Sequence, residues 1–161
     1  MNDILAKISS YNIFNNLVPG AVLAFLLASF EIHTIDTKSI VTDLLVFYFI
    51  GLVISRVGSL VVEPVFKWIG FIKYAEYKDY LAANAKDEKI AVLLEENNQY
   101  RTFVSLILIL AVVVAGKEAV RYFGISQNWV YAVITTMLFV IFAFSYRKQT
   151  SYIRRRVENQ K

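Results

Sequence analysis

Ile40 to Ile69 reads IVTDLLVFYFIGLVISRVGSLVVEPVFKWI, and we interpret the rest of the chain around this segment. It opens as an apolar run of bilayer length, since a helix needs about 20 residues to cross the hydrocarbon. The run then carries Arg56 and ends at Glu63 and Pro64. A soluble core helix that is apolar all round gains nothing from a charge, whereas a membrane helix carries one near a bilayer face or against a protein interior. We therefore predict a membrane-spanning helix over 40–62.

The composition extends this interpretation to the whole chain. Of its 161 residues, 57% are hydrophobic, and these gather in blocks as spanning helices do. The chain has no cysteine, and His33 is its one histidine, so we expect no disulfide framework, metal site or cofactor. Nucleotide-loop and hydrolase motifs are absent. Because the last two apolar runs offer few hydroxyls, among them Ser105, Thr135 and Thr136, we expect no enzyme and no catalytic residues.

Four apolar runs divide the chain, at 11–32, 40–62, 102–120 and 129–146. We predict an all-α integral membrane protein with four transmembrane helices and a cytosolic helical hairpin between spans two and three. Residues 1–62 form the N-terminal segment and first transmembrane hairpin, 63–101 the cytosolic hairpin, 102–146 the second transmembrane hairpin and 147–161 a basic tail. Asp87 is a candidate N-cap for the second arm of the cytosolic hairpin, which should run directly into span three. Pro19 predicts a kink or a helix start in span one.

The lysines and arginines predict the orientation. Thirteen of them fall in the N-terminal segment, the middle segment and the tail, and three in the two short links. Because cytoplasmic loops carry the excess of such residues, both termini and the hairpin should face the cytoplasm. We therefore expect a multi-pass protein of the bacterial inner membrane, with the lipid bilayer as its first partner. The polar residues 1–16 are unlike a cleavable signal peptide, so the first run should be retained.

Two polar groups are candidates for lining a pore or forming its gate. Helical spacing places the members of each on one face, and they are Asn12, Asn15 and Asn16 in the first group and Ser55, Arg56, Ser59 and Glu63 in the second. The asparagines act either as ordinary caps of an interfacial helix or as a latch between helices or subunits. Arg56 either snorkels to the headgroups, pairs with Glu63 or with the asparagine face, or lines a pore.

Aromatic and basic side chains alternate in the middle segment, as in surfaces that stack bases and neutralise phosphates. The candidate ligand-binding residues are Lys73, Tyr74, Tyr77, Lys78, Tyr100 and Arg101. Interspersed acids dilute the positive charge, so packing in an oligomer or lying on the membrane surface is the alternative. The tail, with Arg154 to Arg156, is typical of a positive-inside anchor, and nucleic-acid or DNA binding is the other interpretation.

YNIFNNLVPG at 11–20, the four spans and the helical middle segment resemble small bacterial membrane effectors of anti-phage defence, and among them the membrane effector of the Hailong system. In such systems a nucleotide or short-DNA signal sets whether the effector stays shut, and the open effector permeabilises the inner membrane. The resemblance implies that the tyrosine-rich segment and Arg101 sense a nucleic-acid ligand. It also implies a partner nucleotidyltransferase that supplies the signal.

These observations predict a homo-oligomer, because one subunit has too few polar span residues to make a path alone. A closed ring is the expected form for identical subunits, and four copies is our working number. The leading hypothesis is a gated pore, an ion channel or membrane-disrupting effector controlled by an oligonucleotide or cyclic nucleotide. The alternative is a non-conducting scaffold or accessory subunit that anchors a cytosolic partner. A transporter is disfavoured because the chain is short and shows no inverted repeat.

Overall fold

The computed structural model describes residues 2–87 and 89–158, with the side chains of the first helix described from Ile13 onward. All regular secondary structure in these ranges is helical, which confirms the all-α prediction. The elements are α1 (Asn2–Ser29), α2 (Ile40–Val57), the π-helical turn η1 (Gly58–Val62), α3 (Glu63–Trp68), α4 (Tyr77–Asn84), α5 (Lys89–Phe123) and α6 (Gln127–Glu158).

Three helices of the described chain are long and apolar enough to cross a membrane, as expected of a membrane protein. They are Ile40–Trp68, in which α2, η1 and α3 form one continuous helix, together with Lys89–Phe123 and Gln127–Glu158. The apolar part of α1, Ile13–Ser29, is shorter. Four spans therefore stay a prediction, and it depends on α1. α1 does not begin at Pro19 but runs through it from Asn2 to Ser29, so of the two predicted outcomes, a kink or a helix start, the helix start is wrong.

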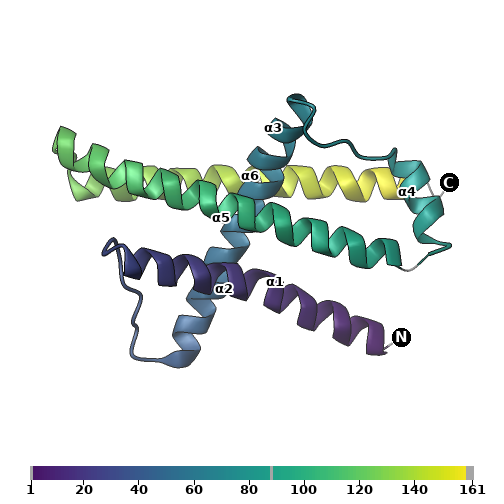
Figure 1. Ribbon diagram of the computed structural model, residues 1–161, viewed down its shortest axis with the longest axis horizontal. Helices are drawn as coiled ribbons and strands as arrows, with labels where there is room; N and C mark the ends of the chain where they lie inside the picture. The colour runs from purple at the N-terminus through teal and green to yellow at the C-terminus, as the bar shows by residue number, and fades with distance from the viewer. Residues whose placement is uncertain (1, 88, 159–161) are drawn as a thin grey trace.

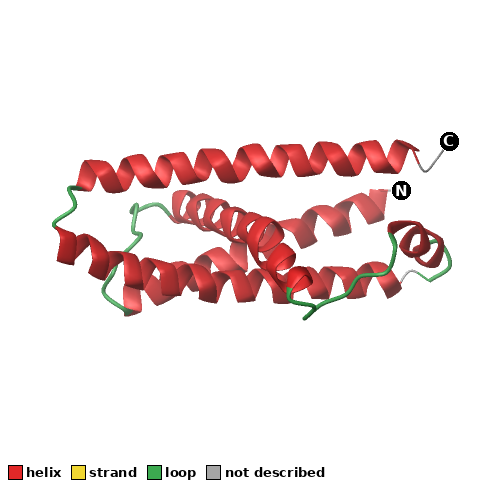
Figure 2. Cartoon of the chain, turned by 90° about the horizontal axis from the view of Figure 1, so that it is seen from above, coloured by secondary structure: helices red, strands yellow, loops and turns green. Residues whose placement is uncertain are grey.

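The continuous helix α2–η1–α3 is the centre of the fold. α1, α5 and α6 run along the long dimension of the molecule, and α2–η1–α3 crosses them steeply (Figures 1 and 2). α1 packs most extensively on α2, α5 packs on α1, α2 and η1, and α6 packs mainly on α2 and η1 rather than on α5. At 29 residues, the central helix is longer than a perpendicular crossing needs, and such helices tilt in the bilayer.

The buried core is small and lies where three helices meet. It consists of Leu23 of α1, Ile54 of α2 and Leu106 of α5, with a few half-buried neighbours. Many large apolar side chains remain exposed, among them Trp129 and Phe139 of α6. A protein surrounded by hydrocarbon can present such a surface, because lipid tails are as apolar as the side chains they cover.

Glycines let α1 and α2 approach closely at two points of their crossing. A Cβ added to Gly51 of α2 would lie 1.6 Å from the carbonyl oxygen of Asn16 in α1, and one added to Gly20 of α1 would lie 1.7 Å from that of Phe47 in α2. Both helices therefore touch backbone to backbone. Small residues serve this purpose in membrane helix pairs, where close packing replaces the hydrophobic driving force available in water.

The predicted cytosolic hairpin over 63–101 is only partly helical. Its first arm breaks at Gly70, whose φ of 74° ends α3 in the left-handed conformation. The N–H of Phe71 donates to the carbonyl of Phe66 and the N–H of Gly70 to that of Lys67, which is a Schellman cap. Helix resumes only at Tyr77, and α4 packs on α5. The hairpin and its cytosolic position therefore stay predictions.

The second arm follows the sequence prediction more closely. The Asp87 carboxylate accepts a hydrogen bond from the N–H of Lys89 at 3.0 Å, which is the kind of contact that an N-cap side chain makes. α5 then runs without interruption from Lys89 to Phe123, as predicted for an arm that continues into span three. The segment around α4, the N-terminal part of α1 and the C-terminal part of α6 lie at the same end of the molecule (Figures 1 and 2).

We expect Gly51→Ala to loosen the packing of α1 on α2, because the new methyl group would meet the Asn16 backbone. Overpacking of this kind costs about 1–3 kcal/mol, measurable as a lower midpoint of thermal unfolding in detergent. Gly116→Ala is the matched control, since the methyl group that it adds would meet no neighbouring atom within 4 Å and alanine favours helix there. Equal midpoints for the two variants would contradict this crossing.

Candidate functional site

A carboxylate shared by three cations lies where α3, α5 and α6 meet. Glu63, 7% exposed, accepts a hydrogen bond from Arg101 Nη1 at 2.6 Å and from Lys67 Nζ at 2.8 Å. Lys148 Nζ of α6 lies 3.7 Å from the same carboxylate. We call these four residues, Glu63, Lys67, Arg101 and Lys148, the ionic cluster.

Local backbone geometry brings Arg101 to Glu63. The π-helical turn η1 bonds the N–H of Glu63 to the carbonyl of Gly58, so one extra residue is accommodated just before α3. Gly58 faces α5, where a Cβ would lie 2.6 Å from Ser105 Oγ. Ser105 in turn donates to the carbonyl of Arg101 at 2.7 Å. The missing side chain at position 58 thus lets α5 approach close enough for Arg101 to reach the carboxylate.

α6 joins the ionic cluster through one lysine. Lys148 Nζ donates to both the carbonyl and the hydroxyl oxygen of Ser59, each at 2.7 Å. Two tyrosines border the lysines: Lys67 Nζ lies 4.3 Å from the ring centroid of Tyr74, and Lys148 Nζ 5.7 Å from that of Tyr152. Both distances are within the range of cation–π attraction. Each of the two ammonium groups therefore lies close to both the Glu63 carboxylate and a tyrosine ring.

The ionic cluster carries more positive than negative charge. Its three cations share the single carboxylate of Glu63. Arg101 Nε is buried and has no hydrogen-bond partner in the described chain. An unpaired buried donor costs about 1–3 kcal/mol. The cluster therefore links three helices and keeps a net positive charge.

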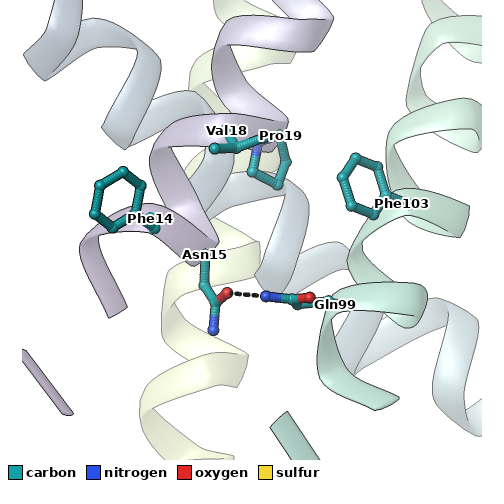
Figure 3. A pocket seen from close by; sticks show the side chains of 6 residues that line it. All are labelled: Phe14, Asn15, Val18, Pro19, Gln99 and Phe103. Atoms are coloured by element: carbon teal, nitrogen blue, oxygen red, sulfur yellow. Dashed lines mark hydrogen bonds between the residues drawn. The ribbon is translucent and has the colours of Figure 1, made fainter. Parts of the chain in front are cut away.

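A second polar contact joins α1 and α5. Gln99 Nε2 donates to Asn15 Oδ1 at 2.6 Å. The pair lies at the edge of a small open pocket of about 160 Å³, whose other walls are apolar or aromatic (Figure 3). The lining residues are Phe14, Asn15, Val18, Pro19, Gln99 and Phe103. The amide pair ties α1 to α5, as the hypothesis of an inter-helix latch requires of Asn15.

The predicted gate residues are only partly brought together. Glu63 belongs to the ionic cluster and Ser59 accepts from its Lys148, whereas Asn16 lies against Gly51 through its backbone. Glu63 pairs with Arg101, Lys67 and Lys148, and among the described residues no carboxylate pairs with half-buried Arg56. The extra residue in η1 shifts the helical register between Arg56 and Glu63, which breaks the spacing that suggested their pairing. The side chain of Asn12 lies outside the described part.

The predicted ligand-binding residues are also divided. Arg101 belongs to the ionic cluster, and Tyr74 borders it and accepts from Asn97 Nδ2 at 3.3 Å. In the described chain no side-chain hydrogen bond, ion pair or ring contact joins Arg101 to the remaining candidates, Lys73, Tyr77, Lys78 and Tyr100. Sequence reasoning missed Lys67, Gln99 and Lys148. The sequence did point to Lys148, because this residue lies just beyond the end of an apolar run, as Glu63 does. Arg101 lies just before the start of another such run.

No protein-family model matches this chain, and comparison with curated proteins and with solved structures finds no significant match. The resemblance to defence effectors therefore stays a prediction. Within residues 2–87 and 89–158, His, Asp and Glu side chains form no group of three that could hold a metal ion.

We expect Glu63→Gln to destabilise the fold strongly, because it leaves three cations facing one another without a carboxylate. Removing one partner of a buried ion pair costs about 3–5 kcal/mol, and the partial exposure of the cations favours the lower end. The midpoint of thermal unfolding in detergent measures the change.

Glu118→Gln is the control, because Glu118 pairs with Arg121 at an exposed site, where ion pairs contribute about 0.2–1 kcal/mol. The double variant Glu63→Gln with Arg101→Gln should lose less than the sum of the single losses, since both remove the same contact. Additive losses would contradict the ionic cluster.

Proposed function

We propose that this chain is a subunit of an oligomeric inner-membrane effector that opens a gated pore or disrupts the membrane in anti-phage defence. A nucleotide or short nucleic acid, sensed on the cytosolic side, controls it. The observation that carries the proposal is Arg56. This arginine is half-buried in the apolar helix α2 and has no carboxylate partner in the described chain.

An arginine in this position needs polar neighbours beyond those that the described part of its chain supplies. A charge near the middle of a membrane helix costs at least about 2.5 kcal/mol. Headgroups, water in a path or the polar face of a second copy would remove this cost. Ser55 lies next to Arg56, and Ser59 of η1 lies about one turn further on, so α2 and η1 together offer a short polar stripe to such a path.

Assembly supplies what one chain lacks. A single copy places few polar side chains among its apolar spans, whereas identical stripes from several copies can line one central path. Closed cyclic symmetry brings the same face of every copy to the axis, and rings of basic side chains are typical of pores that pass anions. Four copies remain the working number.

The ionic cluster is the natural place for control. It links α3, α5 and α6, and Arg101 is one of the residues predicted to bind the ligand. A phosphate that bound Arg101 in place of Glu63 would break the contact that joins α5 to α3. Lys148 would then face a carboxylate that no longer binds Arg101. The partner nucleotidyltransferase would act indirectly, as the source of this ligand.

A non-conducting scaffold is the second candidate, and exposed aromatic side chains favour it. Trp68 is 87% exposed and Tyr100 72% exposed, both in the segment predicted to be cytosolic. Aromatic side chains dominate the contact energy of many protein interfaces. In this alternative the segment docks a cytosolic partner and the spans serve as its anchor.

Single-cysteine labelling tests the predicted orientation, because the natural chain has no cysteine. We expect Ala82→Cys and Gln149→Cys to react with a membrane-impermeant maleimide only after the inner membrane is permeabilised. His33→Cys and Ser126→Cys should react from the periplasmic side without permeabilisation. All four positions are exposed in the structure. Labelling of Ala82→Cys in intact spheroplasts would overturn the topology.

Reconstituted vesicles test conduction. We expect the full-length protein to carry current across a KCl gradient, with short single-stranded DNA oligomers and cyclic dinucleotides as the trial ligands. Arg56→Ala should shift the reversal potential toward cation selectivity, because it removes a positive charge from the path. Arg121→Ala is the control, since Arg121 is exposed and pairs with Glu118. Vesicles that stay tight with folded, oligomeric protein under every trial ligand would favour the scaffold.

A further inference from the structure

The ionic cluster has the composition of a phosphate site. One carboxylate faces three cations, so the group keeps a surplus of positive charge after its internal pairs are formed. Guanidinium groups present five donors and bind phosphate oxygens in pairs. Arg101 uses Nη1 on Glu63, and its Nε donor has no acceptor in the described chain. The cluster therefore has spare positive charge, and Lys67 and Lys148 carry the donors that reach the surface.

The surplus charge is accessible from outside the protein. Lys67 is 46% exposed at its side chain and Lys148 is 25% exposed, while the Glu63 side chain between them is 9% exposed. An approaching anion meets the two ammonium groups before it meets the carboxylate. The rings of Tyr74 and Tyr152 border the lysines and hold them near the cluster. The site thus presents cations outward and keeps its acid inside.

Its place along the helices identifies the source of the phosphate. Glu63 directly follows the apolar run 40–62, Arg101 directly precedes the run that begins at 102, and Lys148 follows the run that ends at 146. Three transitions from apolar to charged sequence thus meet at one point in space. In a bilayer, hydrocarbon gives way to phosphate at this boundary.

We propose that Lys67, Lys148 and Arg101 bind the phosphate of an anionic phospholipid headgroup. The bound lipid supplies the negative charge that Glu63 alone does not, and it joins α3, α5 and α6 from the membrane side. The site does not require conduction, because a non-conducting chain with the same cluster would bind the same lipid. The lipid and the nucleotide of the proposed function would compete for Arg101, so the two proposals make opposite predictions for the ligands compared below.

Native mass spectrometry of the full-length protein, released from phosphatidylcholine nanodiscs with or without phosphatidylglycerol, tests the proposal. We expect phosphatidylglycerol to be retained in preference to phosphatidylcholine. Lys67→Gln and Lys148→Gln should each weaken its retention about fivefold, since a basic residue near the membrane surface contributes about 1 kcal/mol of attraction to anionic lipid. If Lys148→Gln fails to fold, the more exposed Lys67→Gln still decides the result.

Arg154→Gln is the matched control, because this arginine lies further along α6 and pairs with Glu158 at an exposed site. A loss of retention as large as that of Lys148→Gln would reduce the effect to general surface charge and overturn the site. Inorganic phosphate or a nucleotide that raises the unfolding midpoint in phosphatidylcholine nanodiscs as much as phosphatidylglycerol does would overturn the lipid as its source. Equal retention of both lipids by the natural chain would overturn the proposal entirely.

Discussion

The attraction between Glu63 and its three cations is the contact on which the arrangement of the helices depends. Apolar packing discriminates little between a neighbouring helix and lipid, because the two are equally apolar. Ionic and hydrogen-bonded contacts therefore select which helices meet, and glycines determine how closely those helices approach each other. Glu63 joins α3 to α5 through Arg101 and lies beside Lys148 of α6. The small apolar core of Leu23, Ile54 and Leu106 adds to this selection without determining it.

The central helix can make these contacts because its backbone is irregular at the right place. The π-helical turn η1 inserts a residue between Arg56 and Glu63, so the two charges no longer share the spacing of a regular α-helix. Glu63 meets the cations of α5 and α6, while Arg56 is left without an intrachain carboxylate in the described residues. The π-helical turn thus leaves Glu63 paired within the chain, whereas Arg56 depends on polar groups in its surroundings.

The sequence predicts the helices well and their contacts poorly, for physical reasons. Apolar run length determines where a helix can cross lipid, and side-chain chemistry identifies a cap such as Asp87, so both can be read locally. The break at Gly70 was also a local signal, since glycine readily takes the left-handed conformation that ends α3. Contacts such as Lys148 with Ser59 join residues 89 positions apart. No periodicity in one sequence specifies which residues of two distant helices will meet.

The charge surplus distinguishes the ionic cluster from a purely structural lock. A neutral pair sealed between helices would have no electrostatic reason to respond to its surroundings. Here two lysines reach the surface around a nearly buried carboxylate, so an external anion can change the balance of forces on all three helices. Such changes act strongly where the effective dielectric is lower than that of water. The contact that holds the helices together is thus also the contact through which a lipid headgroup or a soluble phosphate would alter the packing of the membrane segments.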